Sequence, residues 1–359
     1  MRMTKEGKIT FSLLGAGGRG NAYINALNTL YKDKYQLVSI AESSKQRREK
    51  LVFEHNIADN LVFEDYRDFL KKDRISDVVI LSTLDDMHYE PVMELIRLGY
   101  DIILEKPIAM TLEEVLDIGC AVEKHPNNII SVCHVLRCSP FFMAIKDVIN
   151  NAGLGKIVNI QHNENIGYYH FAHSYVRGSW RNTDIAAPLS VAKSCHDFDI
   201  LLYLLGDKEA VKLSSFGSLS HFNEKNFKPN IMAENCFNCS IENECCYSST
   251  KIYNSEKSNV IVFGEAEKEL KKNYKNSNYS KCVYKMDNNV CDHQVTIIEF
   301  DDNITATFNI SAFTNDINRS IKIMCEYGEI RGLEVPCNIE YQKFGSNVVH
   351  TVKPLIEYP

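Results

Sequence analysis

The strongest constraint on the fold is the segment ITFSLLGAGGRGNAYINAL, residues 9–27. An apolar run, a glycine-rich turn and apolar residues at helical spacing predict a strand, a tight turn and a helix. Such a turn suits a phosphate, because glycine permits the turn, lets the backbone approach a pyrophosphate and lets the helix pack closely while its first amides face the anion. Glycines also mark ordinary loops, so later residues must support this interpretation. The candidate cofactor contacts here are Gly15, Gly17, Gly18, Arg19 and Gly20.

An acidic residue ends the second predicted strand, residues 35–43. Glu42 occupies the position where a carboxylate accepts hydrogen bonds from both hydroxyls of an adenosine ribose. Its charge would repel a 2′-phosphate, which favours NAD over NADP. NADP stays possible because Arg47 and Arg48 follow closely and an arginine can pair with that phosphate. Alternatively, both arginines lie on a solvated helix face.

Strands and helices alternate through the first half of the chain. Apolar strands at 76–83 and 100–105, with a helix at 89–98 between them, predict a doubly wound parallel sheet covered on both faces. Ligands bind such sheets at the carboxyl ends of the strands. The further candidate cofactor contacts at these ends are Thr83, Leu84, His88, Glu105 and Lys106.

Lys106 belongs to the tripeptide Glu105-Lys106-Pro107. A lysine at a strand end beside a nicotinamide can exchange a proton with a substrate hydroxyl, and partial burial or a nearby cation lowers its pKa toward that task. Alone, the tripeptide is equally consistent with a surface lysine in a turn.

Composition excludes several classes of protein. The 359 residues are 45% hydrophobic and 24% charged, which suits two folded domains. The net charge of -7 argues against a nucleic-acid surface. No apolar run is long enough to span a bilayer and the N-terminus has no signal-like apolar core, so we expect a cytoplasmic protein with no membrane partner. The 12 cysteines are then expected as reduced thiols, mostly core residues.

Four motifs together resemble the Gfo/Idh/MocA family of NAD(P)-dependent oxidoreductases. They are GAGGRG, AES, STLDDMH and EKPIAMTLEE, in the family's order and spacing. The resemblance implies a Rossmann domain, residues 1–136, followed by an α/β substrate domain with a large, open, mainly antiparallel sheet, residues 137–359. It also implies that this sheet packs against another subunit, in a homodimer or homotetramer.

The resemblance further implies catalytic roles for three side chains. Lys106 matches the family's proton-transferring lysine, and His196 matches a histidine near the start of a second-domain helix. Relatives often have an aspartate four residues before that histidine, where this chain has Ala192. Lys193 instead lies three residues before it, as in a KxxH version of the motif.

The segment GYYHFAHSYVRGSWRN, residues 167–182, is dense in groups that hydrogen-bond polyols. We expect it to be a substrate-recognition loop, although aromatics and arginines are also typical of subunit interfaces. No third ligand at a natural spacing joins its histidines, so we assign no metal there. The candidate substrate contacts are Arg137, His170, His173, Arg177, Trp180 and Arg181.

A polar, irregular segment between about residues 221 and 290 contains a cysteine cluster. Cys236, Cys239, Cys245 and Cys246 raise the hypothesis of a zinc site. The adjacent pair speaks against it, because neighbouring cysteines rarely ligate one ion together.

Alternating strands return after this segment and predict an antiparallel meander. The sequence stops at Pro359 just beyond a strand, so we expect the family's closing helix to be absent or replaced.

The implied activity is reversible hydride transfer between NAD(P) and a secondary hydroxyl of a sugar, cyclitol or polyol. Lys106 would exchange the hydroxyl proton, with His196 and Lys193 assisting. Two alternatives stay open: a glycosidase that oxidises its substrate transiently with bound NAD, and a catalytically inactive cofactor-binding sensor or regulator.

Overall fold

A computed structural model describes residues 7–257 and 272–354 of the chain. Part of the polar segment predicted between 221 and 290, namely residues 258–271, lies outside the described residues. The chain forms two compact units that divide between Cys133 and His134.

The first unit is built on a six-stranded parallel sheet of order β3-β2-β1-β4-β5-β6. This is the strand order of a doubly wound dinucleotide-binding fold, as the sequence predicted. The strands are β1 (Ile9–Leu14), β2 (Tyr35–Ala41), β3 (Val62–Phe63), β4 (Val78–Leu81), β5 (Asp101–Leu104) and β6 (Ile130–Val132). The helices are α1 (Gly18–Leu30), α2 (Lys45–His55), α3 (Tyr66–Leu70), α4 (Tyr89–Arg97) and α5 (Leu112–Lys124), with short 3-10 turns η1 (Asp59–Leu61) and η2 (Asp85–Met87).

Helices cover both faces of this sheet because its strands are apolar on both sides. Leu13 of β1 packs in a core with Ile24 of α1, whereas its neighbour Leu14 packs in a second core with Val92 of α4. Successive side chains of a strand point to opposite faces, so β1 contributes to both cores. All four residues of β4 are buried, as the VVIL run predicts.

The second unit contains a mixed, mostly antiparallel sheet of order β14-β13-β12-β11-β7-β10-β9-β8. Strand β7 (Ile157–Asn165) lies inside it, parallel to β10 and antiparallel to β11. The predicted antiparallel pairing is confirmed for β9 with β10 and for β11 through β14, but β7 lies between β10 and β11 and divides the expected meander into two runs. The remaining strands are β8 (Ala210–Ser218), β9 (His293–Phe300), β10 (Thr305–Ser311), β11 (Asn318–Cys325), β12 (Gly328–Leu333), β13 (Asn338–Lys343) and β14 (His350–Val352).

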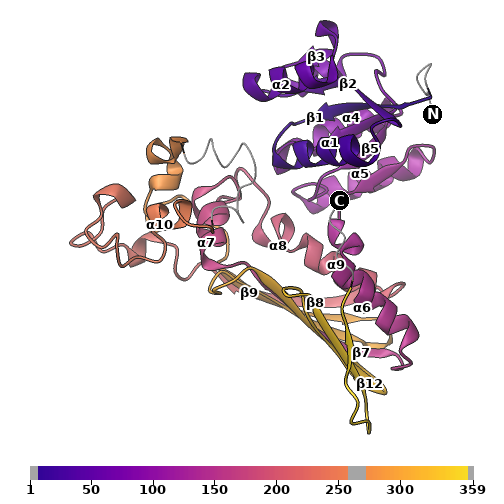
Figure 1. Cartoon of the computed structure of the whole chain (residues 1–359), viewed down its shortest axis with the longest axis vertical. Helices are drawn as coiled ribbons and strands as arrows, with labels where there is room; N and C mark the ends of the chain where they lie inside the picture. Colours follow the sequence, from indigo (N-terminus) through magenta and orange to yellow (C-terminus); the bar gives the residue numbers. More distant parts are fainter. Residues whose placement is uncertain (1–6, 258–271, 355–359) are drawn as a thin grey trace. The chain divides into compact units, whose positions relative to one another are not determined.

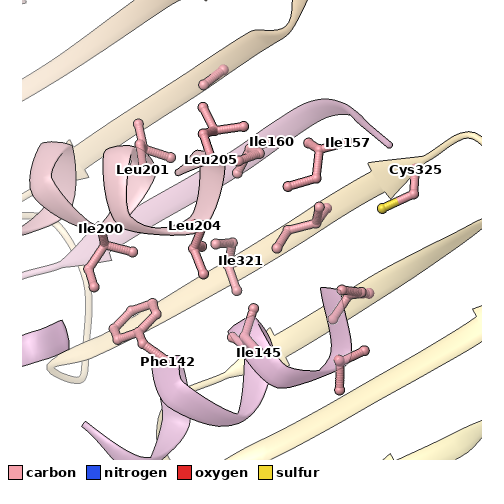
Figure 2. Close-up of a cluster of buried hydrophobic side chains, with 14 of the residues drawn as sticks. Phe142, Ile145, Ile157, Ile160, Ile200, Leu201, Leu204, Leu205, Ile321 and Cys325 are labelled. Carbon is pink, nitrogen blue, oxygen red and sulfur yellow. The ribbon is translucent and has the colours of Figure 1, made fainter. Parts of the chain in front are cut away.

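Two amphipathic helices cover one face of the large sheet, α6 (Pro140–Asn151) and α9 (Cys195–Leu205) (Figure 1). Figure 2 shows Ile145 of α6 and Leu204 of α9 directed toward Ile321 of β11 within the buried cluster. Short helical segments complete the unit: η3 (Val135–Cys138), α7 (Tyr168–Phe171), η4 (Ala172–Arg177), α8 (Leu189–Ala192), η5 (Glu224–Asn226), η6 (Cys236–Asn238), α10 (Ser249–Tyr253), η7 (Tyr274–Asn276), η8 (Asn278–Ser280) and η9 (Asp301–Asn303).

The segment predicted as a substrate-recognition loop is helical, which corrects that expectation. Tyr168 to Phe171 form α7, and residues 172–177 continue as the π-helix η4, whose residues are all buried. The physical reason is the aromatic content of the segment: Phe171, Tyr175 and Val176 pack in an apolar cluster of their own. Among the described residues, no helix is long and apolar enough to cross a bilayer.

His173 of η4 lies inside this aromatic cluster. Its ring stacks on Tyr279 with centroids 4.8 Å apart, and its Nδ1 lies 3.0 Å from the hydroxyl of Tyr253. Burial, assisted by the nearby Arg177 charge, lowers the pKa of His173 to about 4. The folded protein therefore holds this imidazole in its neutral form at neutral pH.

We expect His173 to make the protein sensitive to acid. Its contribution to stability is present above the unfolded pKa of about 6.5 and is lost as the pH falls toward 4, because only the unfolded chain accepts the proton readily. Between pH 7 and pH 5, the free energy of unfolding should fall by about 2 kcal/mol more in the wild type than in a His173→Gln variant. Denaturant titrations at the two pH values measure this difference. Equal losses in the two proteins would contradict it, since all other titrating groups are shared.

Candidate functional site

The glycine turn after β1 has the backbone that its sequence predicts. Gly15 has φ +87°, and a Cβ there would lie 2.6 Å from the carbonyl oxygen of Ser82. A Cβ on Gly20 would lie 2.2 Å from the carbonyl oxygen of Gly15. Both positions therefore require glycine for close packing. Cβ atoms at Gly17 and Gly18 would meet nothing within 4 Å, so the turn leaves open space at these two residues.

Glu42 is buried at the end of β2 and contacts the glycine turn directly. Its carboxylate accepts hydrogen bonds from the backbone N–H of Ala16 at 2.6 Å and of Ser44 at 2.8 Å, and from Arg47 at 2.8 Å. Burial opposes its charge, but the bonds from Arg47, Ser44 and Ala16 lower the pKa of Glu42 overall. The carboxylate is thus ionised and fixed in place, and Arg47 is already paired with it.

The turn that carries Lys106 is held by two buried side chains. Glu105 accepts the backbone N–H of Lys106 at 3.0 Å and the hydroxyl of Tyr23. His88 is fully buried, with Nδ1 2.7 Å from the carbonyl oxygen of Pro107 and Nε2 3.4 Å from that of Thr83. A neutral imidazole has one N–H, and the shorter distance favours donation from Nδ1. His88 therefore ties the Lys106 turn to the start of α4.

The first unit brings all the predicted cofactor contacts to one edge of its sheet. They follow β1, β2, β4 and β5, whose ends are joined by backbone bonds such as Gly15 N–H to Ala41 and Glu105 N–H to Leu81. Lys106 is half-buried there, Leu84 is exposed, and the guanidinium of Arg19 lies 3.8 Å from the Glu105 carboxylate.

The second unit holds a buried cluster of charges beside α9. Arg319 of β11 lies 2.8 Å from Asp197 of α9 and 2.8 Å from Glu164 of β7, whose other oxygen lies 3.0 Å from the ammonium of Lys193. His162 of β7 also lies 2.8 Å from Asp197. Two carboxylates thus face two cations inside the protein, which is how buried charges are tolerated.

The charge cluster shifts the pKa values of its carboxylates in opposite directions. Burial would raise the pKa of Asp197, but the charge of Arg319 and the hydrogen bond from His162 lower it. Burial raises the pKa of Glu164 despite Lys193 and Arg319. Asp197 is therefore the firmly ionised member that anchors α9 to the sheet.

The cluster fixes the two residues that the sequence singled out on this helix. Lys193 is held by Glu164 after α8, and His196 precedes Asp197 in the first turn of α9, where its ring lies edge-on to His134 at 5.9 Å. Sequence reasoning missed Glu164, Asp197 and Arg319. Glu164 could have been found from the sequence. It falls on the inward-facing side of a strand whose residues alternate between buried and more exposed, and a carboxylate there must have a partner.

Four of the six predicted substrate contacts are buried in the core or paired with a carboxylate. Arg177 is 1% exposed and donates to the carbonyl oxygens of Lys281 and Tyr247, both at 2.8 Å, so with His173 it belongs to the core. Arg137 is paired with Asp199 at 2.6 Å and Arg181 with Asp287 at 2.7 Å. We therefore do not carry these four residues into the proposed substrate site.

The other two predicted substrate contacts, His170 and Trp180, remain candidates. His170 is partly exposed, and burial together with the nearby Lys193 charge lowers its pKa well below the usual range. The ring of Trp180 lies 6.4 Å from that of Tyr175 and is also partly exposed.

Comparison with known proteins covers most of the chain. Residues 9–134 match the model of the oxidoreductase family with an NAD-binding Rossmann fold, GFO_IDH_MocA, and residues 146–331 match that of the C-terminal alpha/beta domain of the same family. Together these matches include the whole first sheet and the second sheet as far as β12, without β13 and β14.

Individual relatives agree with this assignment. Putative oxidoreductase YteT of Bacillus subtilis is 28% identical over 200 residues, which are 55% of this chain and 46% of YteT. The scyllo-inositol 2-dehydrogenase (NADP(+)) IolW of the same organism is 27% identical over 208 residues, 58% of this chain and 54% of IolW. The chain spans about half the length of the curated relatives it matches.

A solved structure extends the similarity of fold to almost the whole chain. Levoglucosan dehydrogenase in complex with NADH superposes with a TM-score of 0.68 at 17% identity, covering 96% of this chain and 80% of that one. At this identity the likeness shows the fold alone. Sheet topology and family matches agree, and the chain belongs to the Gfo/Idh/MocA oxidoreductase family.

Proposed function

We propose that the chain is an NAD-dependent dehydrogenase that oxidises a secondary hydroxyl of a sugar, cyclitol or related polyol. The observation that carries this proposal is the edge of the first sheet, where a glycine turn, an ionised Glu42 and the Lys106 turn are held together. The names of relatives support the substrate class, since they include a scyllo-inositol dehydrogenase and a levoglucosan dehydrogenase.

The residues at this edge fit a dinucleotide. The open space at Gly17 and Gly18 lets a pyrophosphate approach the backbone, and α1 has no acidic residue in its first turn to repel it. Glu42 would face the adenosine ribose. Its pairing with Arg47 leaves that arginine less available to a 2′-phosphate, which supports NAD as the preferred cofactor. When bound, the cofactor supplies the hydride acceptor.

Lys106 would receive the proton of the reacting hydroxyl. Glu105 and His88 fix its backbone on both sides, so its side chain starts from a defined position. In the second unit, Lys193 and His196 are the further candidates for proton transfer, and Glu164 holds Lys193 in place. His170, kept neutral by burial and by Lys193, can both donate to and accept from polyol hydroxyls.

Location in the cytoplasm is part of the same proposal. All 12 cysteines lie in the described part of the chain and are free thiols there.

We expect Lys106→Met to abolish turnover without abolishing cofactor binding. A panel of sugars and polyols, tested with NAD and NADP by nicotinamide absorbance, first supplies a substrate. The variant should then lose at least about 100-fold in kcat, because a positioned general acid or base contributes that much. NADH affinity, measured by fluorescence titration, should stay within a few-fold of the wild type and shows that the variant is folded.

Lys124→Met is the matched control, because Lys124 is an exposed lysine of the same unit. It should retain wild-type kcat. Ordinary turnover by Lys106→Met would overturn the role of Lys106. Binding of NAD with no turnover across the panel would favour the sensor or regulator, and turnover of glycosides without net NADH would favour the glycosidase.

We also propose that the uncovered face of the large sheet binds a second copy of the chain. Phe216 of β8 is 70% exposed and lies opposite Val295 of β9, and Ile297 is half exposed on the same face. The other face carries α6 and α9. Apolar side chains gathered on a sheet face mark an association surface.

Phe216→Glu combined with Ile297→Lys should convert the native protein to monomers. Association with a second copy would then bury charged side chains away from water, which costs free energy and should weaken association. Light scattering measures the native mass. Leu213→Glu is the matched control, because Leu213 is exposed on β8 but pairs with the buried Ile298 on the other face. A monomeric wild type, or equal dissociation by the control, would refute this interface.

A further inference from the structure

Four cysteines line one small interior space in the second unit. Cys236, Cys239, Cys245 and Cys282 surround about 20 Å³, which is the room for a single water molecule or ion. Cys246, which the sequence hypothesis included, is exposed and does not line this space. Cys282 takes its place, although it lies 36 residues beyond Cys246 in the chain.

Backbone hydrogen bonds bring Cys282 to the other three cysteines. Asn235 forms a bridge with Lys281, and the N–H of Cys282 donates to the carbonyl oxygen of Glu234 at 2.8 Å. Cys236 starts the turn η6, and the N–H of Cys239 donates back to it at 3.3 Å. The resulting order is a CxxC pair, a third cysteine six residues later and a fourth from an adjacent strand-like segment, which is the pattern of a four-thiolate zinc site.

A buried cation beside these thiols points to a negatively charged occupant. Arg177 lines the same space, is 1% exposed, and its Nη2 lies 3.7 Å from the sulfur of Cys236. Its other partners among the described residues are neutral, namely the carbonyl oxygens of Lys281 and Tyr247 and the hydroxyl of Tyr253. A buried guanidinium without a counter-charge is costly. Zinc bound by four thiolates carries a net charge of about -2 and would supply that counter-charge.

We propose that Cys236, Cys239, Cys245 and Cys282 bind one zinc ion that ties the cysteine segment to the Cys282 segment. Within residues 7–257 and 272–354, no three potential ligands yet stand close enough to hold an ion. Binding therefore requires the four sulfur atoms to close around the space between them. The segment can do so because it consists of turns rather than paired strands. Each thiol loses its proton to solvent when its sulfur coordinates the metal.

Metal analysis of the purified full-length protein tests this site. After rinsing with a chelator, the wild type should retain about one zinc per chain, and replacement by cobalt(II) should give the sulfur-to-cobalt absorption of thiolate ligands. Cys282→Ser should lose most of the zinc and of this absorption. Cys246→Ser is the matched control, because it removes a thiol adjacent to Cys245 but outside the space, and it should retain both.

Several results would overturn the proposal. They are a zinc content near zero in the wild type, iron in its place, a disulfide among the four cysteines in the denatured wild type, or equal zinc loss in the two variants. If Cys282→Ser does not fold, Cys239→Ser replaces it with the same expectation. The readout does not depend on hydride transfer, so it stands or falls separately from the proposed dehydrogenase activity.

Discussion

The second unit depends on the buried pairing of Arg319 with Asp197 and Glu164. These groups come from β11, α9 and β7, so one guanidinium joins the centre of the sheet to the helix that covers it. Removing one member would leave an uncompensated charge in the interior, which costs about 3–5 kcal/mol in typical proteins. The same pairing also positions the two candidate catalytic residues of this unit, because Glu164 holds Lys193 and Asp197 directly follows His196.

In the first unit, the glycine turn after β1 allows the backbone to approach the proposed cofactor closely. Gly15 and Gly20 are required because a Cβ at either position would clash with a carbonyl group. The ionised Glu42, proposed to bind a ribose, is held by a hydrogen bond from the same turn. Lys106 is placed by backbone bonds through Glu105 and His88.

Local patterns in the sequence were enough to predict the fold class and to predict that the candidate cofactor contacts lie close together. Gly15, Glu42 and Lys106 each follow a strand with a clear apolar pattern, and parallel strands bring their ends to one edge. The second site could not be predicted in full. Arg319 lies 155 residues after Glu164, and only the sheet register brings them together. Cys282 was missed for the same reason. The segment around Arg177 was predicted to be a loop because of its polar groups, whereas it is helical and its aromatic residues direct it into the core.

The proposed dehydrogenase activity requires that a hydride pass directly from the substrate carbon to the nicotinamide. Incubation of the protein with NAD and a turned-over polyol deuterated at the reacting carbon tests this most directly, with mass spectrometry of the NADH that forms. The account predicts that each NADH carries the deuterium label on its nicotinamide ring. Unlabelled NADH, or product formed without any NADH, would contradict it.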